Sequence, residues 1–146
     1  MITLDFESYY AKDFSLSVMT TEEYIRSPQF EVIGVSVMVN DEPAQWFTGD
    51  FTSTYLWLQQ FDFLNEAVCS HNAMFDMSIL CWRFGIYPKF MVDTMSMAKA
   101  LYGTSQSVSL AKMAEKFQLP AKGQQVLQAL GLHRKDFGQV FLAEYG

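Results

Sequence analysis

Residues 31–39 (EVIGVSVMV) form the most strand-prone run of the chain, because valine and isoleucine favour extended backbone. The turn-forming residues 40–43 (NDEP) follow directly, and residues 44–48 (AQWFT) can return as the second arm of a hairpin. A hairpin pairs its two strands antiparallel. Any sheet that this chain forms is therefore predicted to contain antiparallel pairing.

The remaining elements alternate between strand and helix patterns. Strands are predicted over 2–6, 66–70 and 90–92, and helices from Thr20, over 52–64, over 73–84 and from Thr94 to about Tyr102. Further helices are predicted over 109–119, 122–130 and 137–146. A hairpin followed by alternating strands and helices predicts an α/β fold with a mixed sheet flanked by helices.

Composition narrows the class of protein. Of the 146 residues, 50% are hydrophobic and 18% are charged, which suits one globular domain and excludes a disordered chain. No run of about 18 uncharged apolar residues exists, so we expect no membrane span and no membrane partner. No signal peptide is visible, and Cys69 and Cys81 match no zinc spacing, so we expect a reduced protein in the cytoplasm. The net charge of −6 argues against broad electrostatic capture of nucleic acid, although nucleases that use metal ions concentrate carboxylates.

Two acids lie on the first predicted strand, in the run Leu-Asp-Phe-Glu at 4–7. Because strand side chains alternate between faces, Asp5 and Glu7 point the same way. Adjacent carboxylates repel each other, and a divalent cation such as Mg²⁺ removes that repulsion. The alternative is that the strand ends at Asp5 and that both acids are solvated.

A second group of polar residues lies in the run 71–76 (HNAMFD), and a third at 92–94 (VDT). Asn72 and Asp76 are four residues apart, so they share one face of the first helical turn. Alone, the pair also fits a helix start at which Asn72 caps and Asp76 matches the helix dipole. His71 fits a loop histidine as well as a site residue. We expect Asp93 to cap the following helix rather than to bind a metal ion.

Taken in order, these motifs resemble the DEDD-type 3′–5′ exonucleases of the ribonuclease H-like superfamily. The resemblance is closest to the proofreading exonuclease region of phage and bacterial family A DNA polymerases. It rests on the stretches LDFESYY, SLSVMTTEEYIRSPQFEVIGVSV, HNAMFD, VDTMSMAKALYG and SLAKMAEKFQL. The fold that it implies is a mixed five-stranded sheet with helices on both faces.

The resemblance also implies a site and a reaction. Asp5, Glu7 and Asp76 would be catalytic and would bind two Mg²⁺ or Mn²⁺ ions, and His71, Asn72 and Phe75 would contact the substrate. The reaction would be hydrolysis of the 3′-terminal phosphodiester of single-stranded DNA. The implied partner is the polymerase domain of a longer protein, in the cytoplasm or, for a phage protein, in the bacterial host cell.

One family motif, Tyr-x-x-x-Asp on the last helix, has no match after Asp93. The run FLAEYG resembles the sequence leading into it, so we expect a domain over 1–146 that stops before this third acidic motif. Such a chain should bind Mg²⁺ or Mn²⁺ weakly and turn over little substrate. Two alternatives stay open: a catalytically silent ribonuclease H-like module that binds nucleic acid or serves as a scaffold, and a free-standing RNA exonuclease.

Overall fold

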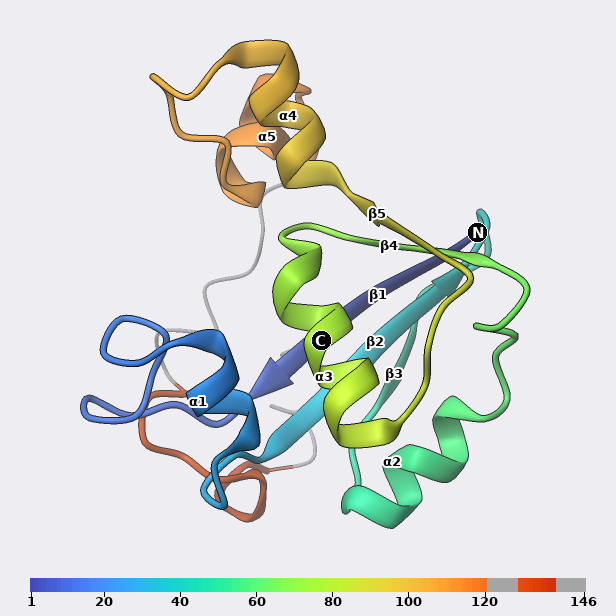
Figure 1. Ribbon diagram of the computed structural model, residues 1–146, viewed down its shortest axis with the longest axis vertical. Coiled ribbons are helices and arrows are strands. Elements are labelled where there is room, and N and C mark those ends of the chain that lie inside the picture. The colour runs from blue at the N-terminus through green and yellow to red at the C-terminus, as the bar shows by residue number, and fades with distance from the viewer. Residues whose placement is uncertain (121–128, 139–146) are drawn as a thin grey trace.

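The computed structural model describes residues 1–120 and 129–138, which contain one five-stranded sheet (Figure 1). Its strands are β1 (Ile2–Ser8), β2 (Val32–Val39), β3 (Gln45–Phe47), β4 (Ala67–Ser70) and β5 (Phe90–Asp93), in the spatial order β3-β2-β1-β4-β5. β1 pairs antiparallel with β2, and β2 with β3, whereas β1, β4 and β5 run parallel. The mixed sheet and the α/β class predicted from the sequence are confirmed.

The described helices are α1 (Thr21–Arg26), α2 (Phe51–Leu58), α3 (Ala73–Phe84), α4 (Thr94–Tyr102) and α5 (Leu110–Lys116), with a 3₁₀ turn over Arg134–Asp136. The bounds of α3 and α4 agree with the sequence prediction. Gly85 ends α3 in the left-handed region at φ +64, which glycine adopts without steric cost.

Two helices are shorter than predicted. The helix expected over 52–64 ends at Leu58, because Phe63 leaves the helical path and becomes buried in the core. The helix expected over 109–119 ends at Lys116, since Gln118 adopts a left-handed backbone and Leu119 N–H turns back to the carbonyl of Ala114.

The two helices predicted over 122–130 and 137–146 lie largely outside the described residues. The parts of them that the structure describes, 129–130 and 137–138, are not helical. The sequence also missed the 3₁₀ turn at Arg134–Asp136.

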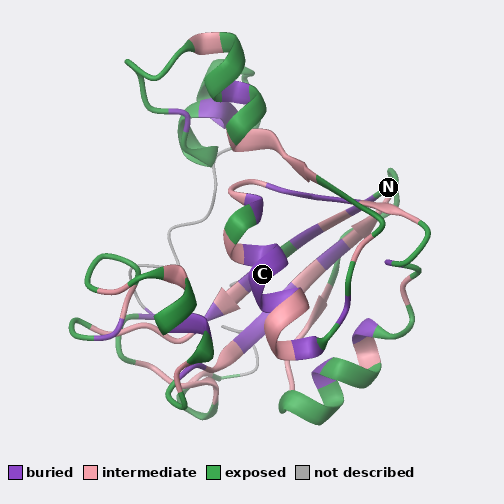
Figure 2. Ribbon diagram, viewed as in Figure 1, coloured by how far each residue is buried: buried purple, intermediate pink, exposed green. Residues whose placement is uncertain are grey.

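The core lies between the sheet and the helices α1, α2 and α3 (Figure 2). Leu4 and Phe6 of β1 face this layer, and the ring of Phe6 stacks on Phe84 of α3 at 5.8 Å between centroids. Each such buried side chain contributes about 1.5–3 kcal/mol. The alternate side chains of β1 point to the opposite face, where Asp5 is exposed.

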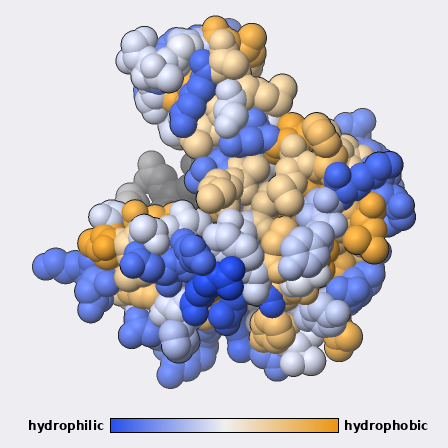
Figure 3. Space-filling view, viewed as in Figure 1, coloured by the Kyte–Doolittle hydropathy of each residue, from blue (hydrophilic) through white to orange (hydrophobic). Residues whose placement is uncertain are grey.

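α1 is a short helix that is stabilised by capping at its start and by the burial of one face. Thr20 and Glu23 form a capping box, which satisfies backbone donors at the helix start. Tyr24 and Ile25 are buried, whereas the solvent side carries charged residues, so Figure 3 shows hydrophilic residues gathered over this helix.

α4 and α5 lie beyond the β5 edge of the sheet and share a small apolar cluster of their own (Figure 1). Its buried members are Ala98, Val108 and Met113. In the described parts of the chain, no helix is long and apolar enough to cross a membrane.

Candidate active site

The candidate site lies where β1 and β4 separate. The two strands pair only at Ile2 with Val68 and at Thr3 with Cys69. One residue further, the hydroxyl of Ser70 donates to the carbonyl of Leu4 at 2.6 Å. Beyond that point no β4 residue pairs with β1, so the strand edge is open to another partner.

Asp76 of α3 is that partner. Its Oδ1 accepts the backbone N–H of Phe6 at 2.8 Å, in the position that a neighbouring strand would otherwise fill. Phe6 lies between Asp5 and Glu7 in the sequence. The bond therefore brings the acid of HNAMFD to the stretch of β1 that carries the other two acids.

Asp76 is buried, with only 2% of the residue exposed. Burial is the largest cause that raises the pKa of Asp76, the Phe6 N–H lowers it, and the negative charges of Asp5 and Glu7 raise it; the resulting pKa is about 8. The three acids therefore lie within electrostatic reach of one another. A divalent cation would relieve this repulsion, and carboxylate oxygens are the ligands that Mg²⁺ and Mn²⁺ prefer.

The three acids do not form a compact cluster. Among residues 1–120 and 129–138, no three His, Cys, Asp or Glu side chains lie close enough together to hold a metal ion. Strand alternation explains this, because Asp5 and Glu7 point away from the face on which α3 packs. The donor chemistry fits a divalent cation, and the metal-binding roles of Asp5, Glu7 and Asp76 stay predictions.

Asn72 occupies the N-cap position of α3, but its side chain makes no cap hydrogen bond, so the side-chain cap considered from the sequence is wrong. The residue adopts the left-handed region at φ 73, which asparagine tolerates better than most residues. Its backbone N–H donates to Asp93 at 3.0 Å.

His71 connects β4 to the α4–α5 region. Its Nε2 lies 2.9 Å from the carbonyl of Val108 and must donate to it, and its Nδ1 lies 2.9 Å from the hydroxyl of Thr94. Because both ring nitrogens are engaged within the protein, the structure gives His71 a structural role. The substrate contact implied for it stays a prediction.

Asp93 occupies the N-cap position predicted for it at the start of α4. Its carboxylate accepts N–H groups of Met95 and Asn72, each at 3.0 Å, and the hydroxyl of Ser96 at 2.7 Å. Burial opposes ionisation, but the bonds from Ser96 and from nearby backbone amides lower the pKa of Asp93 below its ordinary value. One carboxylate thus serves the first turns of both α3 and α4.

We expect Asp93→Ala to destabilise the protein by more than the roughly 0.5–2 kcal/mol of a single lost N-cap, because two helix starts lose their acceptor. Urea unfolding at pH 7 measures the change. Ser96→Ala is the matched control, since it removes one of the bonds and keeps the carboxylate. Equal, small effects of the two substitutions would contradict the double role.

A cleft of about 610 Å³ lies at the end of β1 and has Glu7 in its lining. It is lined by the end of β1, the loop that follows, one residue each of α1 and α3, and one of the C-terminal residues: Phe6, Glu7, Ser8, Tyr10, Ala11, Lys12, Ser15, Leu16, Ser17, Tyr24, Phe75 and Leu130. Phe75, predicted to contact substrate, therefore forms part of the wall, together with Glu7.

Sequence reasoning missed Tyr10, Lys12, Tyr24 and Leu130 as cleft residues. The position of Tyr10 and Lys12 directly after the Asp-x-Glu strand was an available signal. Leu130 had no local signal, because it reaches the cleft from the far end of the chain.

A model of the 3′–5′ exonuclease family matches residues 24–129, well over half of the chain. The match includes Asp76 and Asp93, whereas Asp5 and Glu7 precede it. No curated protein matches the chain. The agreement between this match, the mixed sheet and the acid at the open edge of β1 leads to one conclusion: the chain belongs to the 3′–5′ exonuclease domain family of family A DNA polymerases.

Proposed function

We propose that this domain hydrolyses the 3′-terminal phosphodiester of single-stranded DNA, using two Mg²⁺ or Mn²⁺ ions held by Asp5, Glu7 and Asp76. The observation that carries the proposal is the hydrogen bond from Phe6 to the buried Asp76, which joins a third acid to the stretch of β1 that carries Asp5 and Glu7. When bound, the cations would supply an activated water and stabilise the leaving 3′ oxygen.

The chain's own residues prepare the acids for this role. With a pKa of about 8, Asp76 holds a proton at neutral pH in the metal-free protein. Asp5 is exposed on the strand and Glu7 borders the cleft, so both carboxylates can be reached from solvent. Phe6 N–H keeps the orientation of Asp76 fixed in either protonation state, since a carboxyl oxygen accepts in both.

The lining of the cleft supports a single-stranded substrate. Tyr10, Tyr24 and Phe75 offer aromatic surface, on which unpaired bases stack with little regard to sequence. Lys12 is the cation on this lining and can contact a phosphate. Because the chain carries a net charge of −6, binding should depend on this local surface rather than on a broad basic face.

In this proposal the domain acts beside a polymerase domain of a longer protein, in the cytoplasm. A silent nucleic-acid-binding module is the second candidate. It is favoured by the separation of the three acids within the described residues.

The test uses 5′-labelled single-stranded DNA and RNA of one sequence, with Mn²⁺. We expect the 146-residue chain to bind the DNA and shorten it slowly from its 3′ end. A longer version that supplies Tyr-x-x-x-Asp should be faster by about 10²-fold, because a nucleophile misplaced by about 1 Å loses that much rate.

Each other outcome rejects a part of the proposal. Equal and rapid shortening by both versions would mean that another acid, such as Asp136 or Glu144, already fills the role of the aspartate in Tyr-x-x-x-Asp. Binding without shortening by either version would indicate the silent module. A preference for the RNA would indicate an RNA exonuclease.

A further inference from the structure

Residues 129–138, the last segment that the structure describes, pack against β2 and against the loop that follows β1. Ala129 is buried against Ile33 of β2. Two residues later, Gly131 N–H donates to the carbonyl of Tyr10 at 2.8 Å. Gly131 has a φ of +76, which lets the backbone turn there.

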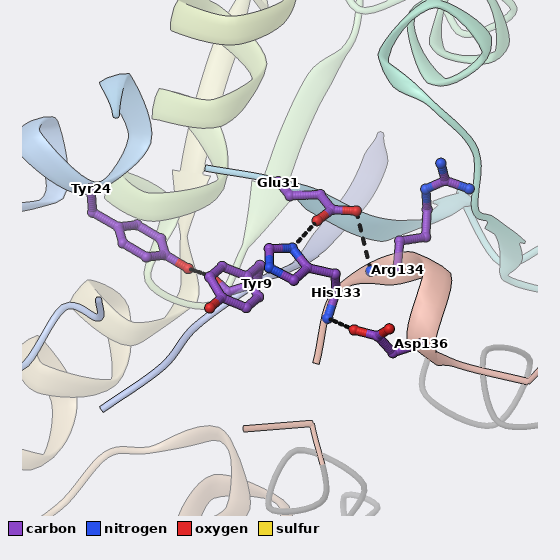
Figure 4. Close-up of polar contacts among 6 residues, drawn as sticks. All are labelled: Tyr9, Tyr24, Glu31, His133, Arg134 and Asp136. Atoms are coloured by element: carbon purple, nitrogen blue, oxygen red, sulfur yellow. Dashed lines mark hydrogen bonds and ion pairs between the residues drawn. The ribbon is translucent and has the colours of Figure 1, made fainter. Parts of the chain in front are cut away.

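A set of polar and aromatic contacts fastens this segment, and we call Tyr9, Glu31 and His133 the clasp (Figure 4). The ring of His133 stacks on the ring of Tyr9, with 3.9 Å between centroids and 8° between planes. Its Nδ1 donates to Glu31 Oε2 at 2.6 Å. The other oxygen of Glu31 accepts the N–H of Arg134 at 3.2 Å, so one carboxylate holds two successive residues.

The clasp is braced from both sides. The hydroxyl of Tyr24 donates to the carbonyl of Tyr9, which fixes the residue on which His133 stacks. The carboxylate of Asp136 accepts the backbone N–H of His133 at 2.9 Å, which fixes the turn that follows it. The position of His133 is therefore determined by α1, by the residue that precedes β2 and by its own 3₁₀ turn.

Leu130 lies between the buried Ala129 and the bonded Gly131, and its side chain borders the cleft. It is 55% exposed, although its neighbours in the segment are held against the protein. A leucine held open to solvent at the wall of a substrate cleft is suited to contact an apolar face of the ligand. The faces of a nucleobase are such surfaces.

We propose that the clasp positions Leu130 as a wall of the substrate cleft, against which the terminal base of the bound strand packs. His133 is then a positioning residue that acts through Leu130. The proposal rests on the proposed function, because it takes the strand end as the occupant of the cleft.

The test measures binding of a fluorescein-labelled short oligothymidylate by anisotropy, with Ca²⁺ in place of Mn²⁺ so that the strand stays intact. We expect Leu130→Ala and His133→Ala each to weaken binding by about tenfold, the scale of a lost apolar contact in a pocket. The double variant should bind the oligonucleotide about as well as the single variant with the lower affinity, because both changes remove the same contact. Lys135→Ala is the control, as an exposed residue of the same turn.

A second measurement needs no ligand. In His133→Ala, amide hydrogen exchange at Gly131 should become faster, because its bond to Tyr10 is no longer held by the clasp. Glu31→Gln is the milder variant in case His133→Ala fails to fold, since it keeps an acceptor for Arg134 N–H. It should change both readouts in the same direction and by less.

The outcomes separate the two proposals. If the unsubstituted chain does not bind the oligonucleotide, the proposed function fails and this inference fails with it. If the chain binds, but Leu130→Ala has no effect or the two single effects add, the proposed function stands and the inference is overturned. Unchanged exchange at Gly131 in both clasp variants also overturns it.

Discussion

In metal-free protein, Asp76→Asn is expected to raise the free energy of unfolding at pH 9 and to remove most of its decline between about pH 4 and pH 8. The carboxyl group is buried and has a pKa of about 8 in the folded protein, against 3.8 for the ordinary side chain. Between these values the folded state holds a proton that the unfolded state has lost. Stability therefore falls as pH rises through this window, by about 1.4 kcal/mol for each unit of pKa difference at most.

Asparagine is the informative replacement because its carbonyl oxygen can still accept the N–H of Phe6 while it carries no charge. Urea unfolding at several pH values, in the presence of a chelator, measures the effect. Asp41→Asn, at an exposed position in the turn after β2, is the control and should leave the pH profile unchanged. A decline of the same size in Asp76→Asn and in the unsubstituted protein would show that another group causes it.

Asp5→Asn is expected to weaken Mn²⁺ binding and to lower strand shortening by about 10²-fold or more, since loss of an anionic ligand displaces the reacting groups. Asp5 is exposed, so the substitution should leave folding intact. Calorimetric titration with Mn²⁺ and the 5′-labelled oligonucleotide assay measure the two effects. The matched control is Asp13→Asn, an exposed acid in the loop after β1.

Unchanged metal binding and shortening in Asp5→Asn would remove Asp5 from the proposed machinery. If Asp13→Asn lost as much as Asp5→Asn, the effect would come from the net charge of the protein rather than from one ligand. If Asp5→Asn lost metal binding but kept binding to the oligonucleotide, the cleft and the metal site would be separable.

Local signals made parts of the fold predictable. Gly85 and Gly103 follow α3 and α4 directly and mark their ends, and Asp93 marks the start of α4 by accepting backbone N–H groups within its own turn. The alternation of buried and accessible residues along β1 placed Asp5 and Glu7 on one face. Each of these features depends on residues that are close in sequence.

Other features depend on contacts between distant residues, which no local pattern records. Asp76 reaches Phe6 because β4 stops pairing with β1 after Thr3, a consequence of how far two strands run together. The motif singled out Asp76 but did not reveal that Asp5 and Glu7 point away from the face on which α3 packs. Glu31 and His133 are 102 residues apart in the sequence, and no local pattern pairs them.

The carboxylate of Asp93 also connects the start of α3 to the start of α4. It bonds to Asn72 at the start of α3 and to Met95 and Ser96 at the start of α4, while His71 fastens Val108 to the same junction. A rotation of the α4–α5 pair must therefore either break these bonds or carry the first turn of α3 with it. Since Asp76 lies in that turn, a displacement of the helix pair that kept these bonds would also move the acid at the edge of β1.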